Sequence, residues 1–449
     1  MPLLSTFGAA SARSLGGIGG AAGGDSYWMT KIAYTSVYPG QLFYDSDNEF
    51  VIAMGAGGAS GSVIQITLNA SDGAYKSSNY PRLRVHDTGE QFSRAKICKI
   101  STGTYGYGMY NYNGSYEQGH LKTGDINFAN GGNQIDVYKS GVYKGSFAQV
   151  VGDTSKLFVA FDQYAHPTTT IIAGRYNDQL AANSRAEKWD YNTGKIMYLR
   201  DMTGDEDSQF LNITRGTNTG YGEYTLTFMR VSGGYLDWSK QFRISNKSTQ
   251  AGEQKSIAFL RNDKAVAVGH TEPSNYSEMF VVSLAYNGNV NFQKSYYSGS
   301  FHYYSHSVAL DSSGNAYVCG FKQASPNRGI IMKLNSSGVF QWGIEVSASG
   351  NAVEIVGIDV DNNGNIYFSG YTTETDRKLI IGKIPDDGST SGTYDSVTFA
   401  SISMSTRDAP TTAESVSGTF NDGSNLLEQG TGDSQIDVFT ATSTNTTTL

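Results

Sequence analysis

Short apolar runs with a period of two recur along most of the chain. Clear examples are AVAVGH (Ala265–His270), AYVCGF (Ala316–Phe321) and IYFSGY (Ile366–Tyr371), which are rich in β-prone residues. Their glycines, Gly269, Gly320 and Gly370, are 51 and 50 residues apart. A helical period of 3.6 is not found over any useful length. The pattern predicts an all-β protein built from a repeated unit.

Each repeated unit is predicted to be a four-stranded antiparallel meander. The turns DSSGN (Asp311–Asn315) and DNNGN (Asp361–Asn365) precede the second strand of two units and carry residues that tolerate the positive φ of a tight hairpin. A third strand such as IIMKLN and a second turn such as NSSG follow. The fourth strand carries an aromatic residue in three units: Trp238, Phe292 and Trp342.

Four-stranded units of this period, arranged around an axis, form a β-propeller. Seven intact units begin near Gln41, Phe92, Phe147, Gly194, Lys255, His306 and Val353. The segments SVSGTF, NLLEQG and QIDVFTA between residues 415 and 441 predict an eighth, partial unit. A lone strand, Tyr27–Ser36, is predicted to close the ring by pairing with the C-terminal segment near Gln435–Ala441. We therefore expect seven or eight blades, with eight favoured by count, in one propeller domain over residues 25–442.

The repeated turn and strand resemble a bacterial and phage β-propeller repeat family whose units read VDssGNvYvtG. The match covers residues 305–384 well, and residues 254–298 in part. The resemblance implies a fold and no particular activity.

Composition and charge exclude several classes of protein. The net charge is −8 and only 16% of the 449 residues are charged, without a basic cluster, which argues against nucleic-acid binding. No apolar run has the length that a membrane-spanning helix requires. We expect no nucleic-acid partner, no membrane insertion and no cofactor.

Candidate catalytic and metal-binding groups are weak. Asp359, Asp361, Asn363 and Gly364 match the start of an EF-hand loop, but Gly370 stands where the bidentate glutamate is needed, so a hairpin turn is favoured over calcium binding. His302 and His306 lie close together in SFHYYSHS, but as a metal pair they would lack further ligands. Cys98 and Cys319 are expected to be buried free thiols. The sequence predicts no catalytic site and no metal site.

Tyrosines cluster in two segments. TYGYGMYNYNGSY contains Tyr105, Tyr107, Tyr110 and Tyr112, and KSYYSGSFHYY contains Tyr296, Tyr297, Tyr303 and Tyr304. Such rings can pack between blades, or they can form an exposed ladder for a glycan or a protein partner. For the first segment we predict outward rings that bind a ligand.

The first 24 residues are rich in glycine and alanine and are predicted to form an extended arm, whereas residues 443–449 are predicted to form a threonine-rich tail. Within the arm, FGAASARSLGG resembles the leaders of structural proteins from marine bacteriophages. The proposed anchors of the arm are Leu3, Leu4, Phe7, Arg13 and Leu15.

Together these features predict a non-enzymatic protein of a phage virion, associated with the tail or a fibre and present in several copies. The arm would dock on other virion proteins, and the propeller would contact the host surface or a neighbouring subunit. The alternatives are a secreted, extracellular bacterial propeller that binds polysaccharide, and a hydrolase that acts on glycans.

Overall fold

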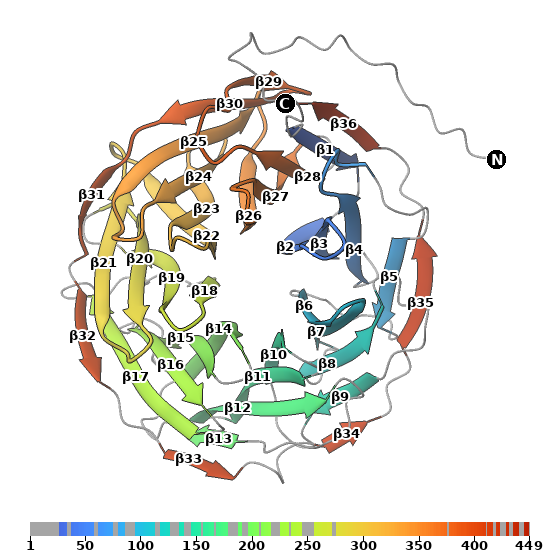
Figure 1. The fold of residues 1–449 in the computed structure, drawn as a ribbon, viewed down its shortest axis with the longest axis vertical. Coiled ribbons are helices and arrows are strands. Elements are labelled where there is room, and N and C mark those ends of the chain that lie inside the picture. Colours follow the sequence, from blue (N-terminus) through green and yellow to red (C-terminus); the bar gives the residue numbers. More distant parts are fainter. Residues whose placement is uncertain are drawn as a thin grey trace.

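A computed structural model gives the fold. It describes the following residues: 27–33, 37–57, 62–74, 80–85, 95–112, 117–125, 134–138, 145–153, 156–165, 168–177, 187–190, 196–205, 208–216, 225–232, 235–244, 256–271, 275–374, 377–409, 411–415, 419–422, 428–430, 434–439 and 444–448. The described residues form strands and turns without any helix, so none of them forms a helix that would span a bilayer. The fold is all-β and of the propeller type (Figure 1).

The described strands form seven antiparallel sheets, which we name A to G and list from the innermost strand outward. Sheet B contains β2 (Val37–Asp45), β3 (Phe50–Gly57), β4 (Ser62–Asn69), β5 (Tyr80–Val85) and β35 (Ser434–Phe439). Sheet C contains β6 (Ala95–Ser101), β7 (Thr104–Tyr112), β8 (Glu117–Gly124), β9 (Gln134–Tyr138) and β34 (Glu428–Gly430). Sheet D contains β10 (Gly145–Asp153), β11 (Lys156–Ala165), β12 (Thr168–Asn177), β13 (Glu187–Asp190) and β33 (Thr419–Asp422).

The remaining four sheets follow the same plan. Sheet E contains β14 (Ile196–Gly204), β15 (Ser208–Gly216), β16 (Thr225–Ser232), β17 (Tyr235–Ile244) and β32 (Thr411–Ser415). Sheet F contains β18 (Ser256–Leu260), β19 (Lys264–Thr271), β20 (Glu278–Ala285), β21 (Val290–Tyr297) and β31 (Ser405–Asp408). Sheet G contains β22 (His302–Leu310), β23 (Ala316–Gln323), β24 (Arg328–Leu334), β25 (Phe340–Ala348), β30 (Val397–Ile402) and β29 (Gly392–Tyr394). Sheet A contains β26 (Val353–Val360), β27 (Ile366–Thr373), β28 (Arg377–Ile384), β1 (Trp28–Ala33) and β36 (Thr444–Thr448).

The innermost strand of every sheet begins within four residues of the predicted start of a unit. The seven innermost strands begin at Val37, Ala95, Gly145, Ile196, Ser256, His302 and Val353. Trp238, Phe292 and Trp342 lie on β17, β21 and β25, which are the fourth strands of sheets E, F and G. The predicted four-stranded meander is therefore confirmed for these units.

The lone N-terminal strand takes the fourth place in sheet A. β1 pairs with β28 on one side and with β36 on the other. Trp28 also repeats a contact made by the other fourth strands: its Nε1 donates to the Ala70 carbonyl of the neighbouring sheet at 3.0 Å, as Trp342 Nε1 donates to the Asp386 carbonyl at 2.7 Å. The predicted completion of the last blade by this strand is confirmed, but its C-terminal partner is β36 rather than the segment near Gln435–Ala441.

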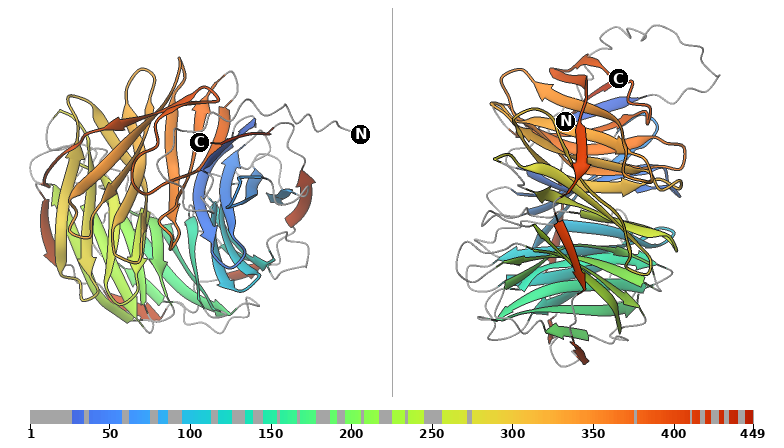
Figure 2. Two further views of the ribbon diagram at one scale, coloured as in Figure 1. Left: turned by 45° about the horizontal axis from the view of Figure 1, so that its top comes forward. Right: turned by 90° about the vertical axis from the view of Figure 1, so that its left-hand side faces the viewer.

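The described strands of the C-terminal segment do not form an eighth unit. Residues 397–448 contribute one strand to each sheet in turn, in the order G, F, E, D, C, B and A, and we call this segment the belt. Each belt strand pairs with the fourth strand of its sheet, and in sheet G the short β29 lies outside it. Figure 2 shows belt strands along the outside of the ring. The predicted partial unit over residues 415–441 is instead the end of β32 together with β33, β34 and β35, on four different sheets. The predicted tail likewise contains β36, which pairs with β1. The alternation of apolar and polar residues identifies a strand but not the strand with which it pairs. Each four-stranded sheet leaves the edge of its fourth strand open, so a C-terminal strand can pair there instead of forming its own sheet.

The core consists of apolar layers between neighbouring sheets. The layer between sheets G and A includes Ile331, Ile344, Ile355 and Phe368, all fully buried, and the belt adds Phe399 to it. A second layer joins sheets A and B through Trp28, Leu68 and Ile381, among others. Because each of these sheets packs on both faces, both sets of alternating side chains are buried.

The ring has two different faces. The turn face carries the turns between the first and second strands and between the third and fourth strands, such as Asp311–Asn315 and Asn335–Val339. The loop face carries the connections between the second and third strands, such as residues 324–327, and the connections from one sheet to the next, such as residues 349–352.

Candidate binding surface

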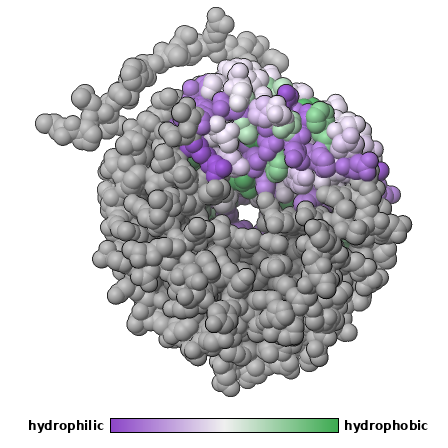
Figure 3. Space-filling view, turned by 180° about the vertical axis from the view of Figure 1, so that it is seen from behind, coloured by the Kyte–Doolittle hydropathy of each residue, from purple (hydrophilic) through white to green (hydrophobic). Residues whose placement is uncertain are grey.

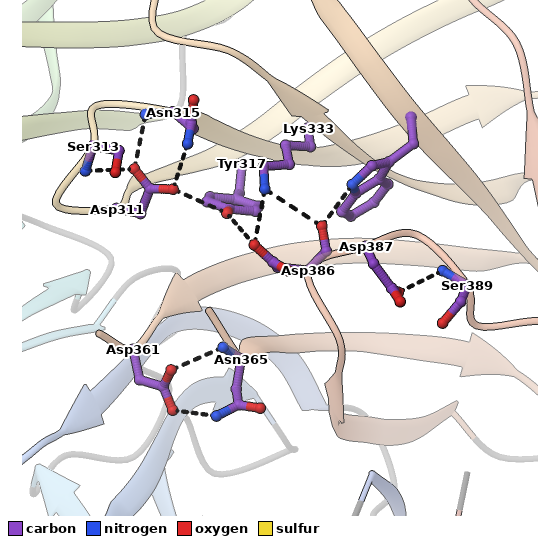
Figure 4. A network of polar contacts seen from close by, with 11 residues as sticks. Asp311, Ser313, Asn315, Tyr317, Lys333, Asp361, Asn365, Asp386, Asp387 and Ser389 are labelled. Atoms are coloured by element: carbon purple, nitrogen blue, oxygen red, sulfur yellow. Dashed lines mark hydrogen bonds and ion pairs between the residues drawn. The ribbon is translucent and has the colours of Figure 1, made fainter. Parts of the chain in front are cut away.

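The repeated turn motif is a local hydrogen-bonding unit on the turn face (Figure 4). The Asp311 carboxylate accepts from the backbone N–H groups of Ser313 and Asn315, both at 2.9 Å, from Asn315 Nδ2 at 2.7 Å, and from the Tyr317 hydroxyl at 3.1 Å. Asp361 accepts the corresponding four bonds from Asn363, Asn365 and Tyr367. The motif D-x-x-G-N-x-Y therefore encodes a hairpin whose aspartate is saturated with donors.

The hydrogen bonds of Asp361 also bear on the EF-hand-like pattern that begins at Asp359. Asp361 has no carboxylate lone pair left for a cation once four donors are bound. Asp359 faces elsewhere, because its Oδ2 accepts from the Tyr44 backbone N–H of the next sheet at 2.8 Å. Among the described residues, no three His, Cys, Asp or Glu side chains converge in a way that would hold a metal ion. The favoured turn interpretation agrees with this geometry.

The first tyrosine segment does not face outward where the structure describes its side chains. Tyr105 and Tyr107 on β7 are both 0% exposed, and the Tyr105 hydroxyl donates to the Asp45 carboxylate of the neighbouring sheet. Burial raises the pKa of the Tyr107 hydroxyl well above its usual value. The prediction that these two rings contact a ligand is wrong, because a blade has a neighbouring blade on each face. The side chains of Tyr110 and Tyr112 lie outside the described residues, as do Leu3, Leu4, Phe7, Arg13 and Leu15 of the arm.

The second tyrosine segment divides between the core and the surface. Tyr296 and Tyr303 are buried, at 0% and 2% exposure, whereas Phe301 is 43% exposed and Tyr304 is half-buried. Figure 3 shows that the described residues on one side of the ring mix hydrophilic positions with small hydrophobic areas. A binding surface therefore has to be identified from individual side chains.

Aromatic and histidine rings gather on the loop face of sheets F and G. We call this group the ring patch, and it consists of His270, Tyr276, Phe301, His302, Tyr304 and Phe321. Within it, the centroids of Tyr304 and Phe321 are 4.9 Å apart and those of His270 and Tyr304 are 4.7 Å apart. Tyr276, at 38% exposure, meets His302 edge-on at 5.4 Å.

Hydrogen bonds hold the ring patch in place. His302 Nδ1 accepts from the Ser277 backbone N–H at 3.1 Å, which ties the second-to-third-strand connection of sheet F to β22. The Tyr304 hydroxyl donates to Gln323 Oε1 at 3.3 Å. Lys322 Nζ lies 4.2 Å from the centroid of the Phe301 ring. The patch thus combines exposed apolar area with polar groups at its edges.

Charges next to the patch are paired. Glu345 binds Lys322 at 3.1 Å and also Arg328, with a shortest N–O distance of 2.5 Å. Burial would raise the pKa of Glu345, but hydrogen bonds from Arg328 and Lys322 bring it below its ordinary value. Toward sheet A, burial would likewise raise the pKa of Glu354, yet His306, Tyr371 and Asn327 lower it to about 2. Among the described residues beside the patch, Lys322 and Arg328 therefore share one carboxylate, which leaves one net positive charge.

A sequence signal for this surface exists in the repeat itself. The residue directly after the closing glycine is His270 in β19, Phe321 in β23 and Tyr371 in β27, so a ring occupies one equivalent position in three consecutive sheets. Gly320 must lack a Cβ there, because an added Cβ would lie 1.9 Å from the Tyr304 carbonyl oxygen. The close approach coincides with a bulge in β22 between Ser305 and Ser307. The histidine pair of β22 was recognisable in the sequence, whereas its ring partners from β19 and β23 were not predicted.

Comparisons with known proteins leave the family open. No protein-family model matches the chain, and no curated protein matches it. Among solved structures, a polysaccharide lyase is similar at 10% identity and a TM-score of 0.47, over 77% of this chain and 90% of the lyase. A prolyl endopeptidase is similar at 10% identity and a TM-score of 0.41, over 75% of this chain. Prolyl oligopeptidase B from Galerina marginata is similar at 8% identity and a TM-score of 0.42, over 76% of this chain.

The chain spans 47% and 49% of the lengths of the two prolyl-specific enzymes. At these identities and scores, the similarities carry no argument about activity.

Proposed function

We propose that this protein is a non-enzymatic structural component of a phage particle, associated with the tail or a fibre, that binds the host surface through its ring patch. In this proposal the chain is a seven-bladed propeller whose ring is closed by β1. The observation that carries the binding role is the ring patch, where two exposed aromatic side chains and a half-buried tyrosine lie beside polar groups. The particle assignment is supported by the leader-like segment FGAASARSLGG.

A saccharide of the host surface is the proposed ligand. Tyrosine and histidine rings provide flat apolar area together with a polar group, which suits a sugar ring that has one apolar side and hydroxyls at its edge. Lys322 and Arg328 share the single Glu345 carboxylate, which leaves one net positive charge beside the patch, so the surface suits a neutral or weakly acidic saccharide. A secreted polysaccharide-binding propeller would use the same patch and differs only in where the protein is found.

The first test is mass spectrometry of purified particles, which should detect the chain in several copies. The second test measures binding of the purified protein to host surface polysaccharide. Phe301→Ala and Tyr304→Ala should each weaken binding about tenfold or more, which corresponds to a loss of about 1.4 kcal/mol. The matched control is Val339→Ala, which removes a 47% exposed apolar side chain on the turn face and should leave binding unchanged.

Each outcome has a separate meaning. Binding that is unchanged in both ring variants, with normal melting temperatures, would remove the ring patch from the proposal. Absence of the chain from particles, together with intact polysaccharide binding, would favour the secreted alternative.

A further inference from the structure

Three charged side chains lie beside the ring patch, on the face of sheet G that packs against sheet F. Lys322 is the cross-strand partner of the buried Tyr303. Glu345 is the cross-strand partner of Ile330. Cross-strand partners share a face of a sheet, and both Tyr303 and Ile330 belong to the core layer between sheets F and G. Arg328 is the partner of Lys322 on β24, so all three charged side chains are on this face.

One carboxylate serves the two cations of this group, and both of its oxygens are in use. Glu345 Oε2 accepts from Lys322 at 3.1 Å, and Glu345 Oε1 accepts from Arg328 Nη1 at 2.5 Å. These hydrogen bonds hold the pKa of Glu345 below its ordinary value, so the carboxylate is ionised at neutral pH. Glu354 lies on the other side of sheet G, where it accepts from Asn327 at 2.8 Å. The three side chains on the sheet F side therefore carry one positive charge in excess.

Arg328 is the cation of this group that a ligand can reach. The Lys322 side chain is 14% exposed, and its Nζ lies over the Phe301 ring. The Arg328 side chain is 44% exposed, and among the described residues its guanidinium is hydrogen-bonded only through Nη1. A guanidinium carries five N–H donors in a planar fork that fits an oxyanion with two parallel hydrogen bonds. Donors of Arg328 therefore remain for a ligand.

Contacts on both sides hold Arg328 in position. The carbonyl of the preceding residue, Asn327, accepts from the Val353 backbone N–H at 2.9 Å, which ties the connection between β23 and β24 to sheet A. Arg328 itself is the first residue of β24 and pairs with Lys322, which contacts the exposed Phe301 ring of the patch. The guanidinium is thus fixed next to the ring patch before any ligand arrives, which lowers the entropic cost of binding.

We infer that the saccharide bound at the ring patch is acidic, and that its carboxylate or sulfate group pairs with Arg328 while its sugar ring lies on the patch. This inference rests on the proposed function, since it assumes that the patch binds a saccharide of the host surface. It adds the class of saccharide and names Arg328 as the residue that selects it. A neutral saccharide would leave the excess positive charge unmatched, whereas an acidic one forms charge-assisted hydrogen bonds, which are the stronger kind.

Chemical modification of the host surface polysaccharide tests the role of its charge. The native polymer is compared with a carboxyl-reduced form, in which each carboxylate has become a hydroxymethyl group, and with a desulfated form. Loss of the group that pairs with Arg328 should weaken binding by the parent chain about tenfold or more. An effect of carboxyl reduction identifies a uronate as the acidic sugar, and an effect of desulfation identifies a sulfate ester.

Variants of Arg328 connect this preference to the guanidinium. Arg328→Ala should bind the native polymer about tenfold more weakly than the parent chain, and should bind native and modified polymers equally. Arg328→Lys keeps the charge but loses the planar fork, so it should retain part of the preference. The matched control is Arg261→Ala, which removes a 59% exposed arginine that pairs with Asp205 on the turn face. It should bind and discriminate like the parent chain, and all three variants should melt like it.

The outcomes separate this inference from the proposed function. Equal binding of the native, carboxyl-reduced and desulfated polymers would overturn the inference, and so would a preference that survives in Arg328→Ala. If Phe301→Ala still weakens binding in either case, the ring patch remains the binding surface and the proposed function stands. If the parent chain does not bind the native polymer at all, the proposed saccharide ligand fails first and the inference fails with it.

Discussion

The blades and the belt are both built from short strands, but they are held together in different ways. A blade is organised by turns whose hydrogen bonds lie within a few residues, as in Asp311–Tyr317. No such turn is found among the described residues of the belt, and each of its strands pairs with a fourth strand that is already part of a four-stranded sheet. The comparison indicates that a blade is defined mainly by its own sequence, whereas the belt is placed by the edges that the blades leave open.

Specific side-chain contacts fasten the belt at two described points. Arg407 on β31 binds the buried Glu278 carboxylate of β20 through two nitrogens, and Ser295 Oγ donates to the same carboxylate at 2.7 Å. Near the start of the belt, Lys31 Nζ donates to the Asp395 carbonyl at 3.2 Å and to Ser396 Oγ at 3.0 Å. These contacts set the position of the belt where backbone pairing alone would allow a shift in register.

Removal of residues 403–449 should produce the largest effect on stability. The deletion uncovers the outer edge of six sheets and leaves the Glu278 carboxylate buried without its arginine, a change that by itself should cost about 2–3 kcal/mol because Arg407 is 40% exposed. We expect aggregation, or a large drop in melting temperature by calorimetry. The control is deletion of residues 1–26, which should leave the melting temperature nearly unchanged. A truncated chain that stays monomeric and melts like the parent would show that the belt is dispensable.

Trp28→Ala tests whether β1 acts as a true fourth strand. Trp28 is 1% exposed, and its loss should reduce the free energy of unfolding by about 3–5 kcal/mol, as measured by urea denaturation. Trp342→Ala in sheet G should cost somewhat less, because that ring is only partly buried. A loss of less than about 1 kcal/mol would contradict this role. It would mean that β1 contributes backbone pairing to sheet A, but that the contact of Trp28 with sheet B does not stabilise the fold.

Arg407→Ala tests the side-chain anchor of the belt. The Arg407 side chain is 40% exposed, so the expected loss of about 2–3 kcal/mol lies below the range for a fully buried ion pair. In the double variant with Glu278→Gln, part of this loss should be recovered, because no buried charge is left unpaired. Strict additivity of the two single changes in a double-mutant cycle would contradict direct coupling.

Asp359→Asn should change the pH dependence of stability by about 1–3 kcal/mol. Burial and, to a smaller extent, the nearby Asp361 raise the pKa of Asp359, the hydrogen bonds from Tyr44 and Val360 lower it, and the result is a pKa of about 6. Between its ordinary pKa of 3.8 and about 6, the folded chain holds a proton that the unfolded chain has released. The contribution of Asp359 to stability should therefore fall as pH rises through this window. Urea denaturation at pH 4 and pH 7 should show a smaller decrease for the variant, and identical pH profiles would argue against the shift.

Some features were predictable from the sequence because the interactions that specify them are local. The D-x-x-G-N-x-Y turns satisfy Asp311 and Asp361 within six residues, so each predicts its own hairpin. The closing glycines and the fourth-strand aromatics then located the units, and the unpaired Tyr27–Ser36 strand was recognisable because it stood outside the repeat. These patterns predicted the strands of the blades and the place of β1.

Other features depended on which surfaces meet in the folded chain. Alternation in TYGYGMYNY shows that β7 has two sets of side chains, but only the neighbouring sheets determine that Tyr105 and Tyr107 are buried. The ring patch combines His270, Tyr304 and Phe321 from three separate strands, and no local pattern brings them together. The belt strands carry ordinary strand signals, yet their partners lie on seven different sheets. A strand's period describes its own two faces, whereas its partners are set by the edges and faces that the rest of the fold leaves uncovered.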